Sequence, residues 1–210
     1  MTKHSSPTGR TADGSQAAGG LIVGRRVVSA AQSLRTIGWY AIKKAEEQET
    51  GSHLEILTSL LMSPLAMEAA LNHVGEHCFS AAIWKALERS TPRGKLNAIA
   101  DQVHLVLDMG SEPFQHFGPM FSFRNQLAHG RTVVIDGIAP YDPVRDNDPT
   151  DTAEFMTSWE RHWNIETAKT WQDAVKGMVN ALCEASGCNN PLFTGTSASW
   201  TIDEGDNDGA

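Results

Sequence analysis

The sequence predicts an all-α protein, an up-and-down bundle of four to five helices with a disordered tail at each end. Between the tails, apolar residues recur mostly at intervals of three and four, the spacing that places side chains on one face of a helix. Capping residues, prolines and glycines stand at the ends of these periodic segments. The length of 210 residues fits one domain better than two.

The two ends of the chain have the composition of tails. Residues 1–20 are rich in Gly, Ser, Thr and Ala without apolar periodicity, and residues 188–210 carry four acidic residues and no basic one. We therefore expect one helical domain over 21–187. Within it, residues 131–151 are irregular and acidic, which predicts a long surface loop whose strand-like run is 133–135.

The first two helices are expected over 27–48 and 53–79, separated by a Gly-Ser pair. Pro64 lies inside the second helix and is expected to kink it, because proline removes one backbone donor. The apolar stripe of the first helix is Val28, Ala31, Leu34, Ala41 and Ile42, and that of the second is Leu57, Leu60, Leu61, Leu65, Leu71 and Val74.

Four more helices are expected along the rest of the domain. A short one near 80–89 precedes one over 93–108, for which Thr91 and Pro92 supply the cap and the first turn. The next opens at Ser111 and Pro113 and ends at His129, with Gly130 as a left-handed cap. The last spans 165–186 between Asn164 as N-cap and Gly187 as stop. The inward residues of the helix over 93–108 are Leu96, Ile99, Val103 and Val106, and those of the next helix are Phe114, Phe117, Phe121 and Leu127. The inward residues of the last helix are Ala168, Trp171, Val175, Met178 and Leu182.

Charge and cysteine content limit the function classes. The chain has 17 basic and 25 acidic residues, a net charge of -8, so contact with nucleic acid must be a local patch. No run approaches the roughly 18 consecutive apolar residues of a bilayer span, and the amino end has no apolar signal core. Cys78, Cys183 and Cys188 lack paired CxxC spacing and suit free thiols in a reducing compartment. We expect a cytoplasmic protein.

The segment Phe123-Arg-Asn-Gln-Leu-Ala-His-Gly130 carries groups suited to phosphate chemistry. Arg124 offers paired donors to a phosphate, His129 exchanges a proton near neutral pH, and Asn125 can orient either one. On an ideal helix Arg124 and His129 lie about 140° apart, so one straight helix cannot bring them together. Asn125 and His129 share a face, and Gly130 lets His129 turn toward Arg124 or a partner chain. Taken alone, these residues also fit a capped helix end with an exposed Arg.

With its surroundings, this segment resembles the signature of the HEPN superfamily of small helical proteins: an Arg, a polar residue, a few positions and a His. Upstream, residues 66–72 resemble the Leu-Glu-Ala-x-x-Asn sequence of the long helix in bacterial members. Gly94-Lys95-Leu96 resembles the Lys-Leu pair that follows this helix in those members. The resemblance covers roughly residues 30–186. It implies a helical bundle that forms a homodimer in which the two RxxxxH segments face each other.

The resemblance also implies a metal-independent ribonuclease that needs no cofactor. His129 would be the acid/base that helps the RNA 2'-hydroxyl attack its phosphate, Arg124 would stabilise the pentavalent charge, and Asn125 would orient them, leaving a 2',3'-cyclic phosphate. Such bacterial proteins often serve as toxins or in phage defence, which would require an antitoxin or another protein partner. Other members with the signature are non-catalytic dimeric modules that bind nucleotide or protein, and this alternative stays open.

Glu68 and Asn72 lie one turn apart on the second helix, with Glu68 beside its apolar stripe. A buried carboxylate needs a partner, because leaving it unpaired costs on the order of several kcal/mol. Arg124 is the candidate partner, and Glu68 would then hold its guanidinium in place. The alternative is a Glu at the edge of the stripe that reaches water.

A third interpretation is a zinc hydrolase that uses His73 and His77. The segment His73-Val-Gly-Glu-His77 matches the HxxEH pattern of some zinc peptidases, with both imidazoles on one helix face. Beyond Ala81, the sequence offers only isolated candidates for the further ligand, such as His104 and His116. Two surface histidines explain the pattern equally simply.

Overall fold

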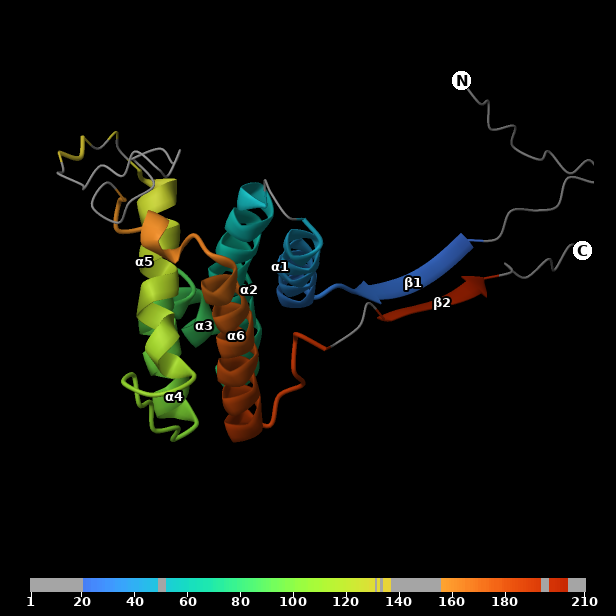
Figure 1. The fold of residues 1–210 in the computed structure, drawn as a ribbon. Coiled ribbons are helices and arrows are strands. Elements are labelled where there is room, and N and C mark those ends of the chain that lie inside the picture. The colour runs from blue at the N-terminus through green and yellow to red at the C-terminus, as the bar shows by residue number, and fades with distance from the viewer. Residues whose placement is uncertain are drawn as a thin grey trace, which may run out of the picture. The chain divides into compact units, whose positions relative to one another are not determined.

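The computed structural model describes residues 21–48, 52–130, 132, 134–136, 156–193 and 197–203. The chain divides into two units, a helical unit over Val28–Gly195 and a second unit formed by the two ends of the chain. Among its described residues, the helical unit has six α-helices and no strand (Figure 1). The helices are α1 Ala30–Glu46, α2 His53–Cys78, α3 Ala81–Leu87, α4 Pro92–Gln102, α5 Phe117–Ala128 and α6 Ile165–Ser186, with short 3-10 turns η1 Phe114–His116 and η4 Glu160–His162. The predicted all-helical structure is confirmed for this unit, although its described part has six helices rather than the four to five expected.

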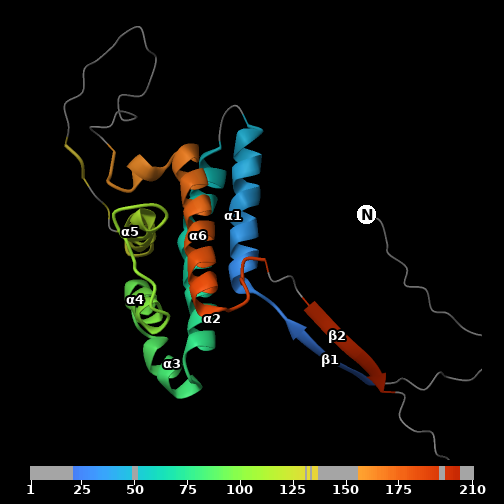
Figure 2. The same cartoon turned by 90° about the horizontal axis from the view of Figure 1, so that it is seen from below.

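Helix α2 is the central element of the bundle. It packs against α1, α3, α4, α5 and α6, while α6 stands between α5 and α1 (Figures 1 and 2). Because α2 has neighbours on several sides, its buried surface is wider than the predicted stripe and includes Ser63, Met67 and Ala70. Leu57, Leu61 and Leu65, which were expected inside, are only partly buried. The buried residues of the whole core include Leu60, Met67, Leu71, Leu96, Ile99, Met120, Phe123, Trp171, Met178 and Leu182.

Length and composition alone would also allow α2 to cross a bilayer, and it is the one described helix for which this holds. Half of the relevant window is buried inside the helical unit. A core helix with neighbours on several sides needs the same apolar composition as a bilayer span. The packing of α2 against five helices therefore accounts for its hydropathy.

Capping residues define several helix ends. The side chains of Ser29, Thr91 and Asn164 each accept the backbone N–H three residues later, at 3.3, 3.1 and 2.8 Å. Gly187 ends α6 with a left-handed backbone at φ 70°. The predicted caps Thr91, Asn164 and Gly187 are thus confirmed. The prediction of a left-handed cap at Gly130 is wrong, because among the described residues only Gly187 is a left-handed glycine. Space favours glycine at position 130 instead, since a Cβ there would lie 2.9 Å from the Gln126 carbonyl oxygen.

Three helices are shorter than predicted. Helix α5 begins at Phe117 rather than near Ser111 and Pro113, and residues 114–116 form the 3-10 turn η1 instead. Helix α1 begins at Ala30, and Val28, expected in its buried stripe, is 57% exposed. Helix α4 ends at Gln102 rather than near 108, because the backbone at His104 turns left-handed at φ 56°. Val106 therefore lies outside the helix and is 89% exposed.

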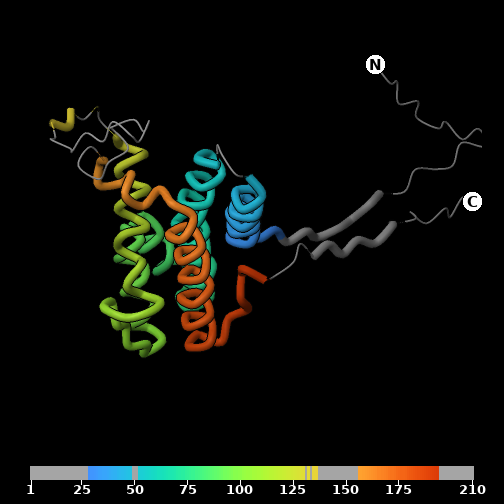
Figure 3. The backbone as a smooth tube through the Cα atoms, viewed as in Figure 1, coloured from blue at the N-terminus to red at the C-terminus, as the bar shows by residue number. Residues whose placement is uncertain are grey.

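The packed chain continues beyond α6, into the segment expected to be a tail from residue 188. Cys188 and Leu192 are buried in the core. The Ser29 hydroxyl donates to the Pro191 carbonyl oxygen at 2.5 Å, which ties this segment to the start of α1 (Figure 3). The tail composition was misleading here because two apolar side chains are enough to dock a short segment on the core.

The second unit contains an antiparallel strand pair, β1 Leu21–Val27 and β2 Ser197–Asp203, in which Leu21 pairs with Asp203 and Val27 with Ser197. Neither strand was predicted: β1 lies in the segment expected to belong to the helical domain and β2 in the expected tail. Each strand is short, and its partner lies at the other end of the chain. The loop expected at 131–151 lies outside the described residues except for 132 and 134–136, which are irregular. Residues 1–20 and 204–210 also lie outside them.

Candidate functional site

Arg124, Asn125 and His129 lie at the carboxyl end of α5. Phe117, Phe121 and other apolar residues on one side bury this helix in the core, which fixes its rotation. The helix ends at Ala128, and the backbone N–H of the C-cap residue His129 donates to the Asn125 carbonyl oxygen at 3.0 Å. The three predicted residues therefore sit on a helix anchored by aromatic packing.

The Arg124 side chain turns toward α2 and forms the predicted ion pair with Glu68. Its Nη2 donates to Glu68 Oε2 at 2.8 Å, with the two side chains 24% and 29% exposed. The guanidinium carbon also lies 5.4 Å from the centre of the Phe121 ring, a cation–π distance. A carboxylate and an aromatic ring thus restrain this guanidinium, and the expected partner of Glu68 is confirmed.

A second cation, Lys95 of α4, reaches the same carboxylate. Lys95 Nζ donates to Asn72 Oδ1 at 2.8 Å and lies 3.7 Å from Glu68 Oε1, while its side chain is only 4% exposed. We call Glu68, Asn72, Lys95 and Arg124 the Glu68 cluster. Lys95 belongs to the Gly-Lys-Leu sequence that carries the family resemblance, but no role was predicted for it. The sequence does contain a signal that Lys95 faces the core. Lys95 lies one turn before the buried Ile99, so the two residues share a helix face.

The Glu68 cluster keeps an excess of positive charge. Two cations share one carboxylate, so one net positive charge remains. Arg124 Nε is buried and has no hydrogen-bond partner among the described residues. That buried donor is shielded from solvent, so only the exposed part of the guanidinium can meet a ligand; the Arg124 side chain is 24% exposed. The residual positive charge of the cluster therefore suits an anion at this exposed part of Arg124.

Asn125 and His129 do not join this cluster. Both side chains are exposed, one helical turn apart, as the spacing predicts. Within the described part of the chain, no hydrogen bond or ion pair connects Arg124 with His129. The structure therefore brings Arg124, Glu68 and Asn72 together and leaves Asn125 and His129 at the surface of the single chain.

The HxxEH segment of α2 is explained by packing. Val74 and Gly75 face inward, and a Cβ at Gly75 would lie 2.2 Å from the Trp84 ring. His73 and His77 are exposed, and His73 Nε2 lies 3.1 Å from the Asn189 carbonyl oxygen. Among the described residues, no three His, Cys, Asp or Glu side chains are grouped to hold a metal ion. The zinc interpretation gains no support from this arrangement.

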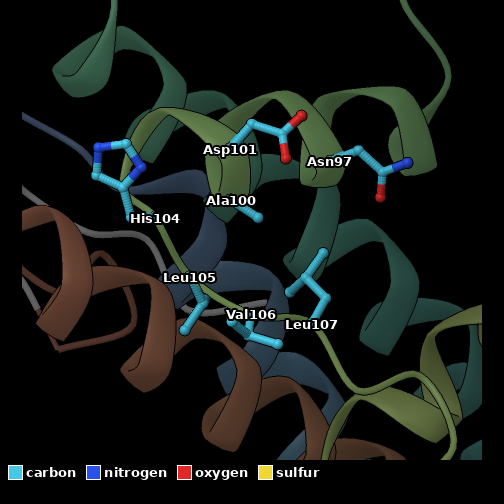
Figure 4. A pocket seen from close by; sticks show the side chains of 7 residues that line it. All are labelled: Asn97, Ala100, Asp101, His104, Leu105, Val106 and Leu107. Atoms are coloured by element: carbon cyan, nitrogen blue, oxygen red, sulfur yellow. The ribbon is translucent and has the colours of Figure 1, made fainter.

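A surface pocket of about 490 Å³ lies apart from the predicted residues, at the end of α4 (Figure 4). Asn97, Asp101 and His104 provide its polar groups, and the extended segment 105–107 provides apolar ones. None of the four members of the Glu68 cluster lines it. His104, one of the isolated histidines considered for zinc, is thus placed in this pocket.

No protein-family model, no curated protein and no solved structure matches this chain. The resemblance to the HEPN superfamily accordingly remains an expectation based on the residues quoted for it. The geometry of α5 and of the Glu68 cluster is the ground on which a function can be proposed.

Proposed function

We propose that this protein is a metal-independent, HEPN-type endoribonuclease that acts as a homodimer. The observation that carries the proposal is the restrained Arg124 guanidinium, held by Glu68 at 2.8 Å, on the same helix end as exposed Asn125 and His129. A restrained cation can stabilise the charge that develops on a phosphate, and a solvent-accessible imidazole can transfer a proton; these are the two roles that metal-free cleavage of a phosphodiester uses.

In the proposed reaction, His129 accepts the proton of the RNA 2'-hydroxyl. The 2'-oxygen forms a bond to the neighbouring phosphorus, and the bond from phosphorus to the 5'-oxygen breaks. The leaving 5'-oxygen takes up a proton from water, and the protonated His129 releases its proton to the solvent, which gives a 2',3'-cyclic phosphate, a 5'-hydroxyl end and a neutral imidazole. Arg124 stabilises the additional negative charge on the pentavalent phosphate, and Asn125 orients the imidazole or the phosphate.

The separation of Arg124 and His129 in one chain supports the proposed homodimer. Five positions on a helix point the two side chains about 140° apart, and Arg124 is drawn toward α2. A second copy that places its own α5 end opposite would bring one imidazole toward the other guanidinium. Because the chain carries a net charge of -8, the expected target is a short RNA element bound at this local site.

The test is cleavage of bulk transfer RNA by the purified full-length chain in EDTA. We expect cleavage with 2',3'-cyclic phosphate ends, lost in His129→Ala and in Arg124→Gln. His77→Ala, which removes another exposed histidine, is the matched control and should cleave normally. Light scattering on the same samples measures the dimer.

Three results would overturn the proposal. Cleavage that survives in His129→Ala would show that another group performs the chemistry. A dimer that leaves both transfer RNA and mixed-sequence RNA intact would instead identify a binding module. Activity that chelator abolishes and that His73→Ala also removes would select a zinc hydrolase.

A further inference from the structure

We infer that Lys95 is a positioning residue for Arg124, acting through the shared carboxylate of Glu68. For its catalytic consequence, this inference rests on the proposed function. The juxtaposition comes from three different helices: Glu68 and Asn72 from α2, Lys95 from α4 and Arg124 from α5.

The burial of Lys95 needs an explanation. Its side chain is 4% exposed, and removing an ammonium group from water costs several kcal/mol unless partners compensate. Asn72 Oδ1 accepts one hydrogen bond from Nζ at 2.8 Å, and Glu68 Oε1 at 3.7 Å supplies the opposite charge. If Lys95 only filled space in the core, an apolar side chain would fill it without the free-energy cost of burying a charged group. The structure thus points to a role for the charge itself.

Lys95 fixes the orientation of the carboxylate on which Arg124 depends. One oxygen of Glu68 faces Lys95 and the other accepts from Arg124 Nη2, so the two cations hold the carboxylate from two sides. Glu68 is 29% exposed and, without Lys95, would be free to rotate toward water. Arg124 would then lose the partner that sets its position.

Lys95 also keeps Arg124 electropositive. An isolated Arg–Glu pair is neutral overall, whereas the Glu68 cluster retains one net positive charge because Lys95 shares the carboxylate. That residual charge favours an approaching phosphate and its more negative transition state. Both the position of Arg124 and the net charge of the Glu68 cluster therefore lead to the same expectation. Replacing Lys95 with a neutral residue should weaken stabilisation of the transition state.

The experiment measures the full-length Lys95→Met variant in two ways. Exchange of the buried Arg124 Nε–H with water, followed by NMR and assigned with Arg124→Lys, reports whether the guanidinium is held. The kcat for the transfer RNA that the wild type cleaves reports catalysis. Lys44→Met is the matched control, because it removes an exposed lysine that pairs with Glu55 at 2.9 Å on another part of the helical unit.

We expect the Arg124 exchange rate to rise at least tenfold in Lys95→Met while the backbone amides of α6 stay protected. The kcat should fall on the order of 100-fold, as for other small misplacements of a reacting group, with KM nearly constant. Lys44→Met should change neither quantity. Unchanged Arg124 exchange in a folded Lys95→Met protein would overturn the inference, as would faster exchange with an unchanged kcat.

A second variant keeps the test decisive if Lys95→Met does not fold. In Lys95→Met/Asn72→Leu both members of the buried polar pair become apolar, so neither is left unpaired, and such replacements are often neutral for stability. The same exchange result is expected. If the wild type cleaves no RNA, the proposed function fails, while Arg124 exchange still decides whether Lys95 positions the guanidinium.

Discussion

The guanidinium of Arg124 and the carboxylate of Glu68 meet at 2.8 Å although 56 positions separate them in the sequence. The contact joins α5 to α2, the central helix of the bundle. The position of the carboxyl end of α5 is therefore tied to the most extensively packed of the described helices.

A double-mutant cycle on this pair should give a measurable coupling. Glu68→Gln and Arg124→Gln each remove one charge, and their effects on the free energy of unfolding should be less than additive by about 1 kcal/mol. This size lies at the upper end of exposed pairs, because both side chains are partly buried. The same cycle on the surface pair Lys44–Glu55 should give a smaller coupling. Additive effects of Glu68→Gln and Arg124→Gln in urea denaturation would contradict the pair in solution.

Gly75→Ala should destabilise the protein by about 1–3 kcal/mol, because the added methyl group has no room. A Cβ there would lie 2.2 Å from the Trp84 ring, and that ring is buried. Gly118→Ala is the matched control: nothing lies within 4 Å of its Cβ position, and alanine there should raise helix stability by about 0.5–1 kcal/mol. Thermal denaturation of both variants measures the difference. Equal melting temperatures would show that α3 does not pack on α2 as described.

Acid should destabilise the fold through His162. Burial lowers the pKa of this imidazole from its ordinary 6.5, and its ring lies 5.4 Å from that of Trp171 and 6.3 Å from that of Phe123. Below about pH 6.5, His162 therefore binds a proton more readily in the unfolded chain than in the folded one. The free energy of unfolding consequently falls as the pH decreases toward the lowered pKa of the folded state. In His162→Gln this part of the decline disappears.

Chemical denaturation between pH 7.5 and 5 measures the slope, with exposed His77→Gln as the control. His77→Gln should keep the wild-type slope. A His162→Gln slope identical to that of the wild type would mean that the imidazole is hydrated in the folded protein.

Cys183 should resist alkylation in the native protein. The pKa of the Cys183 thiol is raised to about 12. Burial is the main cause, and the hydrogen bond from Cys188 Sγ at 3.2 Å is the second. At pH 8 the thiol is neutral and therefore a poor nucleophile. Iodoacetamide should leave Cys183 unmodified in the folded protein and label it after denaturation, as peptide mass spectrometry would show. Labelling of the native protein at the rate of the unfolded chain would refute the buried environment.

The bundle was predictable because local patterns decide most of it. The caps Thr91, Asn164 and Gly187, and the inward stripe of α6, depend on residues three or four positions apart. The predictions that differed depend on distant neighbours. The buried side of α2 is set by five packing partners, and β1 and β2 pair across almost the whole chain.

At the candidate site, too, some residues could be identified from local sequence, whereas others depend on packing between distant elements. Arg124, Asn125 and His129 were found from one short segment, and the Glu68–Arg124 pair from the cost of burying a carboxylate. Lys95 was missed as a member of the cluster, because its contact with Asn72 depends on how α4 lies against α2. Spacing along one helix does not contain that information.

The hydrogen bond from Ser29 to Pro191 has a consequence for engineering of the helical unit. It shows that the unit begins and finishes at one place on its surface. Circular permutation is thus open to this protein: a short Gly-Ser linker from Phe193 to Ser29 would close the chain, and new ends at the exposed turn between α3 and α4 would interrupt no helix.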